Sequence, residues 1–351
     1  MLEQSEIAHY LLSVGLVKAR DVVEEDLTIV DASQRNRVFV VTTRAGPTYV
    51  VKQAGPRSAL TLEHEAAVLR VLGDTPALAQ HVPVLVEHDR EAARLVLRSP
   101  GGAREWTQQN GSRRFPPARA RGLAQALAAL HELPADSVED LPTGVDPMWA
   151  LSLPEPSHDV LLQLSAGARD LVARLQTSAA LCDRLYQLRE AVADDHVVHG
   201  DPRWENCLLV AAPGSRRRTR LLLVDWELAG RGAAAFDLGT VLAEYLYAWV
   251  RSIPIADPTD PGRLVSLARA PLWRMQPAIE TFWSAYGRAR QRASSLRRVT
   301  ELAAVRLLQT VVERAEGLAT LSAHTVTLVQ LADNMLRQPE HVALSLMGLR
   351  E

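Results

Sequence analysis

Two polar residues in the segment VVHGDPRWENCLLV, residues 197–210, have the types and spacing that phosphoryl transfer to a hydroxyl requires. Asp201 is followed five residues later by Asn206, and strand-like residues flank both. A carboxylate in such a loop can orient the hydroxyl and accept its proton. A nearby amide oxygen can bind Mg²⁺ without competing for that proton. The spacing therefore predicts that Asp201 is catalytic and that Asn206 is a metal ligand.

Two further carboxylates follow the apolar run LLLV, residues 221–224. The run leads directly into Asp225, and Glu227 comes two residues later. A carboxylate at the end of a buried strand is costly unless a cation compensates its charge. We therefore expect Asp225 to be the main Mg²⁺ ligand. Glu227 is expected to assist through a water molecule or a second metal ion.

The elements that position these residues change in character along the chain. Helical spacing over 4–20 and 59–72 alternates with β-branched runs, which predict a hairpin and a second pair of strands. The expected strands are 38–43 with 48–53, and 83–89 with 93–99. After SPGG, residues 99–102, the patterns become mainly helical, with helices expected over 116–134, 158–193 and much of the last 115 residues. Two short strands, 207–210 and 221–226, interrupt them.

These patterns predict an α+β fold with two lobes. The expected organisation is a small β-rich lobe over 1–98, a hinge over 99–103 and a larger, mainly α-helical lobe over 104–351. A chain of 351 residues with 47% hydrophobic residues is long enough to build two cores.

The composition excludes several classes of partner. The formal net charge of −2 gives no overall field that would attract nucleic acid or an anionic membrane. No apolar run reaches the length of a membrane span, and the N-terminal residues lack the features of a secretory signal. We therefore expect a cytoplasmic protein whose two cysteines, Cys182 and Cys207, are free thiols.

Lysine is scarce in this sequence, since Lys18 and Lys52 are the only lysines among 39 basic residues. Arginine offers a planar, bidentate charge, whereas lysine offers a compact ammonium on a flexible stem. The bias by itself is no sign of function. It does indicate that a retained lysine can mark a place where a compact charge is needed.

HGDPRWEN, residues 199–206, followed by VDWELAGRGAAAFDLG, residues 224–239, resembles the aminoglycoside phosphotransferase and choline kinase-like family. That family has the pattern HGDxxxxN, then a strand ending in D-[FW]-E, then an Asp-Leu pair that opens a helix; Asp237 and Leu238 match the last part. The segment LAQALAALHELP, with His131 near its end, is similar to a helix that precedes the catalytic loop in this family. The resemblance covers most of residues 30–250 and implies a two-lobed, protein-kinase-like fold.

The resemblance also implies a nucleotide site in the first lobe. Lys52, on a strand, would contact the α- and β-phosphates of ATP, and Glu65, on the next helix, would orient it. The backbone of Ser99 and Gly101 would bind the adenine at the hinge. The loop before residue 38 has no glycine, and Ser33 and Asn36 would bind the phosphates in its place. GTP remains open as an alternative nucleotide.

The acceptor is left open between two classes of hydroxyl. One is a small-molecule alcohol or antibiotic. The other is a Ser or Thr of a precursor peptide in ribosomal natural-product biosynthesis, in which case a partner lyase is expected. Residues 241–351 contain 13 arginines against 10 acidic residues, so a polycationic aminoglycoside is disfavoured. A pseudokinase acting as a binding module is a third reading.

Several other charged residues have plainer interpretations. Asp237 is expected to cap a helix or to brace the catalytic loop, and His199 to bind backbone groups around that loop. His131 and His196 are expected to be satisfied core or interface histidines. The arginine-rich segments 215–220 and 287–298 are expected to be solvated, although the second would suit an acidic partner.

Overall fold

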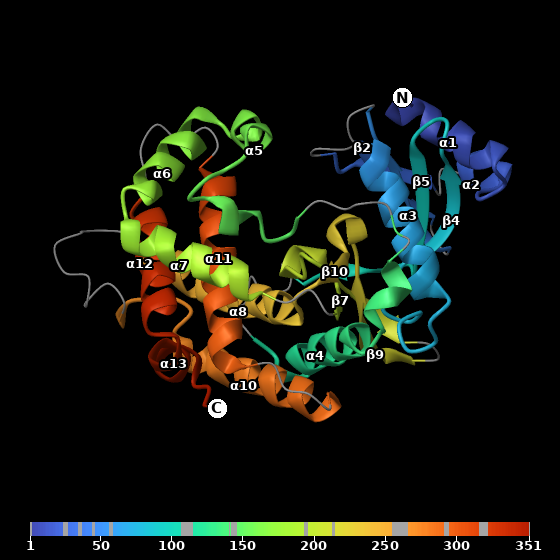
Figure 1. Cartoon of the computed structure of the whole chain (residues 1–351). Coiled ribbons are helices and arrows are strands. Elements are labelled where there is room, and N and C mark those ends of the chain that lie inside the picture. The colour runs from blue at the N-terminus through green and yellow to red at the C-terminus, as the bar shows by residue number, and fades with distance from the viewer. Residues whose placement is uncertain are drawn as a thin grey trace. The chain divides into compact units, whose positions relative to one another are not determined.

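The computed structural model describes residues 2–23, 27–33, 37–43, 46–55, 59–106, 115–139, 141, 146–192, 196–212, 215–254, 266–290, 295–315 and 322–350 (Figure 1). By the packing of its backbone, the chain divides into two compact units. Unit 1 consists of Met1–Gln109, Asp136–Val145 and Glu205–Gly230, and unit 2 consists of Asn110–Ala135, Asp146–Trp204 and Arg231–Glu351. The boundary between Trp204 and Glu205 falls inside the loop predicted to be catalytic. The lobe limits expected from the sequence stay a prediction.

Unit 1 is built on a five-stranded antiparallel sheet with the strand order β1-β2-β3-β5-β4. Its strands are β1 (Leu27–Asp31), β2 (Arg37–Thr43), β3 (Thr48–Gln53), β4 (Val84–Asp89) and β5 (Arg94–Ser99). The expected hairpin and second strand pair are confirmed. The sequence analysis missed β1, which pairs with β2 at the edge of the sheet.

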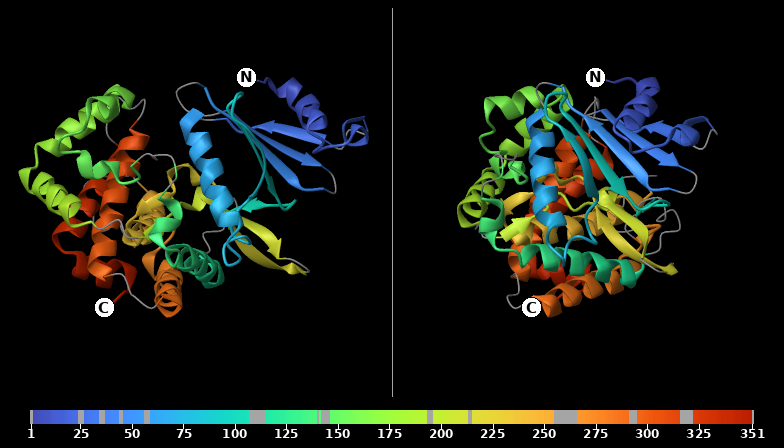
Figure 2. Two further views of the ribbon diagram at one scale, coloured as in Figure 1. Left: turned by 45° about the vertical axis from the view of Figure 1, so that its right-hand side comes forward. Right: turned by 90° about the vertical axis from the view of Figure 1, so that its right-hand side faces the viewer.

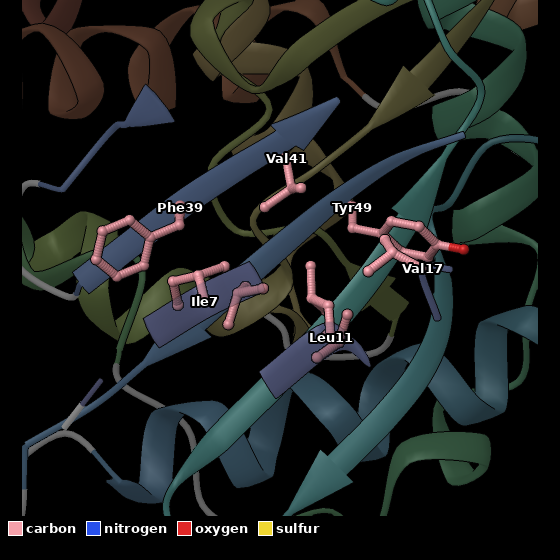
Figure 3. Close-up of a cluster of buried hydrophobic side chains, with 8 residues drawn as sticks. Ile7, Leu11, Val17, Phe39, Val41 and Tyr49 are labelled. Carbon is pink, nitrogen blue, oxygen red and sulfur yellow. The ribbon is translucent and has the colours of Figure 1, made fainter. Parts of the chain in front are cut away.

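Helices cover both faces of this sheet, as Figure 2 shows for α1 (Gln4–Ser13) and α3 (Ala59–Gly73). Ile7 and Leu11 of α1 pack with Phe39, Val41 and Tyr49 of the sheet in a buried cluster (Figure 3). Side chains alternate between the two faces of a strand. Because Tyr49 faces α1, Lys52 of the same strand projects from the opposite face, toward α3. The first helix ends earlier than predicted, and α2 (Ala19–Val23) follows separately.

A smaller sheet in unit 1 carries the second half of the predicted motif. Its strand order is β6-β8-β9, with β6 at Arg104–Glu105, β8 at Cys207–Ala212 and β9 at Ser215–Leu223. The hairpin of β8 and β9 confirms the two strands expected there. The second strand ends at Leu223, so Asp225 lies just beyond it rather than within it, and a short 3₁₀ helix, Trp226–Leu228, follows.

Unit 2 is mainly helical. Its helices are α4 (Pro117–His131), α5 (His158–Gln163), α6 (Ala166–Gln176), α7 (Ala179–Ala191), α8 (Ala234–Ser252), α10 (Leu272–Ala289), α11 (Leu296–Arg314), α12 (Ala323–Arg337) and α13 (Pro339–Val342). The segment expected as one amphipathic stretch over 158–193 forms three helices, because Ser165 and Ser178 each accept a hydrogen bond from the first turn of a new helix.

The centre of unit 2 is α11, which is buried along most of its length. It packs against α8 at Gly239, where a side chain would come within 2.7 Å of the backbone nitrogen of Ala303. The glycine therefore allows two helix backbones to approach closely. Unusually for such a helix, α11 also buries Glu301, Arg306 and Gln309. Strand β7 (His196–Val198) precedes the loop predicted to be catalytic and agrees with the strand-like residues noted there.

These observations confirm the expected α+β fold, with an antiparallel sheet in one unit and a helical majority in the other. Among the described residues, no helix is both long enough and apolar enough to span a membrane.

Candidate active site

Unit 1 holds Lys52 in direct contact with Glu65. The Nζ atom of Lys52 donates to both carboxylate oxygens of Glu65, at 2.8 and 2.9 Å. The Glu65 side chain is fully buried, and one of its oxygens also accepts a hydrogen bond from the backbone N–H of Trp226 at 3.3 Å. The sequence analysis expected Glu65 to orient Lys52, and the contact between these two side chains is confirmed. Glu63 instead lies 3.4 Å from Arg90.

Asp225 is the second carboxylate on Lys52, with its Oδ1 atom 2.8 Å from Nζ. Asp225 adopts a left-handed backbone conformation, φ 67° and ψ 65°. A non-glycine residue in this region costs roughly 1–2 kcal/mol, and such strain is concentrated at functional sites. The conformation lets the chain turn out of β9 while the carboxylate reaches back to the lysine.

The charge of Lys52 is secured by these neighbours. Burial by itself would lower the pKa of Lys52, but the carboxylates of Glu65 and Asp225 outweigh that effect and raise the pKa above its ordinary value. Lys52 therefore stays an ammonium ion throughout the neutral pH range.

The two predicted Mg²⁺ ligands lie on neighbouring strand ends of unit 1. The backbone N–H of Val224 donates to the carbonyl of Asn206 at 3.0 Å, which places Asp225 next to Asn206. The Asp225 side chain is 40% exposed, so its carboxylate is accessible to an ion. A carboxylate and an amide oxygen suit Mg²⁺, which commonly takes one or two carboxylates and completes its shell with phosphates and water. The residues present therefore fit this ion.

No group of three or more acidic, His or Cys side chains gathers into a metal site within the described part of the chain. Glu227 is partly buried in the 3₁₀ helix after Asp225. A site built from Asn206 and Asp225 would thus depend on ligands from a bound nucleotide. The roles of Asn206, Asp225 and Glu227 as metal ligands stay predictions.

Unit 2 contains the first part of the loop predicted to be catalytic, as far as Trp204, and Asp237 braces it. The Oδ2 and Oδ1 atoms of Asp237 accept the backbone N–H groups of His199 and Gly200, at 2.8 and 2.9 Å. Gly200 has a φ of +81°, which favours glycine. Of the two expectations for Asp237, bracing is confirmed and capping is wrong, because the residue lies inside α8 and the N-cap of that helix is Ala233.

His131 supports Asp237 from α4. Its Nε2 atom is 3.1 Å from Oδ2 of Asp237, and its Nδ1 atom is 2.9 Å from the hydroxyl of Tyr286. Since an ionised carboxylate only accepts, Nε2 carries the hydrogen and Nδ1 accepts from the tyrosine. Burial lowers the pKa of His131, against the opposing effect of Asp237. His131 is therefore a satisfied core histidine, as expected.

His199 also has the scaffold role that the sequence predicted. Its Nδ1 atom accepts a hydrogen bond from the backbone N–H of Asp201 at 3.3 Å. At the end of the loop, the backbone N–H of Trp204 donates to Glu244 of α8, and the indole packs edge-on against Tyr245 at 4.9 Å. Both sides of Asp201 are thus fixed to helices of unit 2.

Two arginines contact the carboxylate of Asp201. Arg203 donates to Oδ2 from Nε at 2.9 Å, and its Nη2 lies 2.7 Å from the same oxygen. Nη2 of Arg306, on α11, is 3.6 Å from Oδ1. Arg306 is buried and donates both terminal nitrogens to Glu313, which also lies 3.8 Å from Arg203. We call Asp201, Arg203, Arg306 and Glu313 the aspartate network.

The sequence analysis missed the other three members of the aspartate network. Arg203 stands within the catalytic motif and could have been noticed there. The signal for Arg306 is weaker. It is a charged residue within the apolar helical run AAVRLL, and this setting indicates a buried cation that needs an acidic partner. Nothing local links either Arg306 or Glu313 to Asp201.

The remaining predicted nucleotide contacts are distributed over unit 1. The hydroxyl of Ser33 accepts the backbone N–H of Val38 at 3.0 Å, so it helps to close the turn before β2. Asn36 lies outside the described residues. Ser99 is buried at the end of β5, and a side chain at Gly101 would come within 2.6 Å of the carbonyl oxygen of Gly46. Nucleotide binding by Ser33, Ser99 and Gly101 stays a prediction.

Solved structures share this fold. An aminoglycoside 2′-phosphotransferase-IIIa in complex with GDP has a TM-score of 0.52 at 13% identity, over 96% of this chain and 100% of that one. Aminoglycoside phosphotransferase APH(2″)-Ib with bound ADP has a TM-score of 0.52 at 13% identity, over 95% and 99%. A choline/ethanolamine kinase family protein from Mesorhizobium loti has a TM-score of 0.51 at 16% identity, over 96% of each chain. At these identities the likeness concerns the fold alone.

Residues 26–305 match the model of the phosphotransferase enzyme family. Because this span covers most of the chain, the protein belongs to that family, and the predicted resemblance is confirmed. The protein is therefore an enzyme that transfers phosphoryl groups. A search of curated protein sequences gives no match.

Proposed function

We propose that this enzyme transfers the γ-phosphoryl group of ATP, in the presence of Mg²⁺, to a hydroxyl of a small molecule that is not polycationic. The observation that carries the proposal is the contact of Lys52 with the buried Glu65 and the accessible Asp225 in unit 1. An ordered ammonium beside a strained, accessible carboxylate is suited to holding phosphates next to a metal ion. The bound GDP and ADP in two solved structures of this fold support a nucleotide as the donor, and GTP stays an alternative.

In the nucleotide half of the reaction, Lys52 would bind the α- and β-phosphates while Glu65 keeps it in place. Asn206 and Asp225 would hold Mg²⁺, with Glu227 assisting. When bound, the ion would neutralise charge on the phosphates. Since Lys52 also contacts Asp225, part of that contact would give way as phosphates and a cation arrive.

In the hydroxyl half of the reaction, Asp201 would orient the acceptor hydroxyl and accept its proton. The Arg203 side chain is 27% exposed, whereas Arg306 is 3% exposed. An acceptor that approaches Asp201 would therefore displace the more exposed Arg203, while Arg306 keeps the carboxylate in its orientation. Alignment and charge neutralisation would supply most of the rate enhancement.

A small-molecule acceptor is favoured over a Ser or Thr of a precursor peptide. The feature of this sequence that suited the peptide alternative, with its partner lyase, was the arginine-rich segment 287–298, which would bind an acidic leader peptide. Three of the four described arginines in this segment have acidic partners: Arg290 lies 3.3 Å from Glu132, and Arg297 and Arg298 each lie 3.3 Å from Glu301. These arginines already have acidic partners, so they offer little to an acidic leader peptide.

The nucleotide half of the proposal is tested by calorimetric titration of ATP and of GTP, with and without Mg²⁺. Lys52→Arg should weaken binding strongly, because the planar guanidinium does not fit the space of an ammonium held by two carboxylates. Lys18→Arg is the matched control, since Lys18 is exposed and its side chain has no assigned task. Equal affinity of the two variants would contradict the role of Lys52.

The transfer step is tested by mass spectrometry of hydroxyl-bearing candidates incubated with ATP and Mg²⁺. Asp201→Ala should abolish phosphorylation of any acceptor found while leaving nucleotide affinity intact. Undiminished phosphorylation by Asp201→Ala would exclude Asp201 as the catalytic residue. Tight nucleotide binding with no turnover on any acceptor would favour a pseudokinase.

A further inference from the structure

Both oxygen atoms of the Asp201 carboxylate face guanidinium groups, although a proton acceptor needs an accessible lone pair. Nε of Arg203 donates to Oδ2 at 2.9 Å, and Nη2 of the same residue lies 2.7 Å from that oxygen. An ionised carboxylate oxygen has roughly two lone-pair positions. The two nitrogens of Arg203 therefore cover Oδ2, and a hydroxyl cannot donate to this oxygen while Arg203 stays in place.

The other oxygen, Oδ1, lies on the buried side of the carboxylate. Its neighbour there is Arg306 of α11, whose Nη2 is 3.6 Å away and whose side chain is 3% exposed. Both terminal nitrogens of Arg306 donate to Glu313, at 3.1 and 3.3 Å, so this guanidinium is held in place. Helix α11 packs closely against α8, and Asp237 of α8 braces the backbone before Asp201. A hydroxyl therefore reaches Oδ2 more readily than Oδ1.

Arg203, unlike Arg306, has room to leave Asp201. Its side chain is 27% exposed and belongs to the loop itself. Its Nη1 lies 3.8 Å from Oε2 of Glu313, whose side chain is 28% exposed. When Arg203 moves off Asp201, its charge still has a carboxylate beside it, which reduces the cost of breaking the ion pair. The aspartate network thus offers one guanidinium two carboxylates.

An uncovered Asp201 would serve water as well as an acceptor hydroxyl. In that reaction the water oxygen bonds to the γ-phosphorus of ATP, the bond from this phosphorus to the β,γ-bridging oxygen breaks, and its electron pair leaves with ADP. Asp201 accepts a proton from the water and passes it to solvent, and inorganic phosphate is the second product. Such hydrolysis consumes ATP without forming a phosphorylated acceptor.

We propose that Arg203 is a specificity-determining residue, which covers Asp201 against water and is displaced only by a bound acceptor. An acceptor gains contacts with the protein beyond its reacting hydroxyl, and that binding free energy can offset the displacement of the guanidinium. A single water molecule offers no comparable contacts. The inference rests on the proposed function and makes it more specific, because it assigns the choice between transfer and hydrolysis to one residue.

The test measures the release of inorganic phosphate from ATP with Mg²⁺ by the full-length protein, without any acceptor. Arg203→Gln should raise the hydrolysis rate about tenfold, because hydrogen bonds to a charged group are strong enough to change a rate by this factor. Arg203→Lys keeps the positive charge but offers one nitrogen in place of two, so its rise should be smaller. Loss of folding would lower hydrolysis, so a rise cannot come from damage to the fold.

Two further variants show whether the additional hydrolysis passes through Asp201. The double variant Asp201→Asn/Arg203→Gln should lose it, since the uncovered carboxylate is the group that water uses. Arg174→Gln is the matched control on α6, because Nε of Arg174 donates to Oδ2 of Asp170 at 2.8 Å in an exposed pair. This control should leave the hydrolysis rate unchanged.

A second measurement needs no nucleotide. A water-soluble carbodiimide with glycinamide modifies accessible carboxylates, and peptide mass spectrometry follows each of them. Asp201 should be modified faster in Arg203→Gln than in the unaltered protein. Asp237 is the internal control, because it is fully buried and accepts the backbone N–H groups of His199 and Gly200. It should stay unmodified in both proteins.

The inference is overturned if Arg203→Gln binds ATP in a calorimetric titration but hydrolyses it no faster than the unaltered protein. It is also overturned if the double variant keeps the additional hydrolysis, or if Asp201 is modified at the same rate in both proteins. These failures are distinguishable from failure of the proposed function. ATP binding without a rise in hydrolysis keeps the role of Lys52 and removes that of Arg203. Faster modification of Asp201 without ATP binding supports the cover over Asp201 and contradicts the function.

Discussion

The two units place opposite charges at the centre of their sites. In unit 1 a single cation, Lys52, lies between the carboxylates of Glu65 and Asp225. In unit 2 a single carboxylate, Asp201, lies between Arg203 and Arg306. A lysine provides a compact charge for phosphates, and a carboxylate provides a proton acceptor for a hydroxyl. Each reactive group is thus neutralised by partners of the opposite sign, which reduces the cost of burying it.

The supports of the two sites differ as well. Lys52 and Glu65 stand on a strand and a helix, where the backbone is fixed by regular hydrogen bonds. Asp201 stands in a loop, and a separate set of buried side chains, Asp237 and His131, holds that loop in place. Residues 199–203 have no helix or strand of their own, so this part of the loop needs a separate scaffold.

The largest expected effect comes from removing the reactive carboxylate of unit 2. Asp201→Asn should lower the turnover number about 10²- to 10⁴-fold, because the amide cannot accept the hydroxyl proton. Nucleotide affinity, a property of unit 1, should be unchanged. Steady-state kinetics on an identified acceptor together with calorimetric titration of ATP measure the two effects. If the turnover number and the nucleotide affinity fall together, the assignment of nucleotide binding to unit 1 and proton transfer to unit 2 is wrong.

Removing the central cation of unit 1 should chiefly affect stability. Lys52→Met leaves the fully buried Glu65 without its cation, which should cost about 3–5 kcal/mol of unfolding free energy. The double variant Lys52→Met/Glu65→Leu should recover part of this loss, because it removes the unpaired charge as well. Urea denaturation of both variants provides the measurement. If the double variant recovers no unfolding free energy, the loss in Lys52→Met has a cause other than the unpaired carboxylate of Glu65.

The loop support in unit 2 can be tested at Gly200. Gly200→Ala should destabilise the protein by roughly 1–2 kcal/mol, because alanine is strained at a φ of +81°. Gly122→Ala is the matched control in α4, where a side chain meets no neighbouring atom, and it should stabilise by about 0.5–1 kcal/mol. Thermal unfolding followed by circular dichroism should therefore show shifts of opposite sign. Shifts of the same sign would mean that the loop conformation does not depend on glycine.

The smallest expected effect is a pH dependence that His131 gives to unit 2. Burial lowers the pKa of His131, so below about pH 6.5 the unfolded chain binds a proton that the folded chain does not. Stability should therefore fall as the pH drops below this value, by at most about 1.4 kcal/mol per pH unit from this residue. His131→Gln should flatten the slope of unfolding free energy between pH 6.5 and pH 5. An unchanged slope would assign the dependence to other groups.

Much of the fold and part of the site followed from local patterns. Alternation and helical spacing identified the hairpin before Lys52 and the helix of Glu65, because such periods reflect one buried face of each element. Strand β1 was missed, although it pairs with the neighbouring strand β2, because its short run leads into the segment that was interpreted as a loop. Strand β7 pairs with β10 (Gly230–Gly232), which lies far along the chain, and local periodicity does not reveal such a partner.

The sequence by itself indicated the class of chemistry, phosphoryl transfer, and the residues predicted to perform it. It specified Asp201 with Asn206, the carboxylate of Asp225, and a lone strand lysine that a family pattern joined to Glu65. These predictions depend on residue types and on the spacing between residues, and both can be read from the sequence.

The tertiary structure alone decided which charges meet. It placed Arg306, more than a hundred residues after Asp201, against that carboxylate and paired it with Glu313, and it put Asp225 in a left-handed turn against Lys52. It also gave Arg290, Arg297 and Arg298 of the predicted arginine cluster acidic partners. The physical reason is that ion pairing depends on distance and burial in space, and neither quantity can be read from positions along the chain.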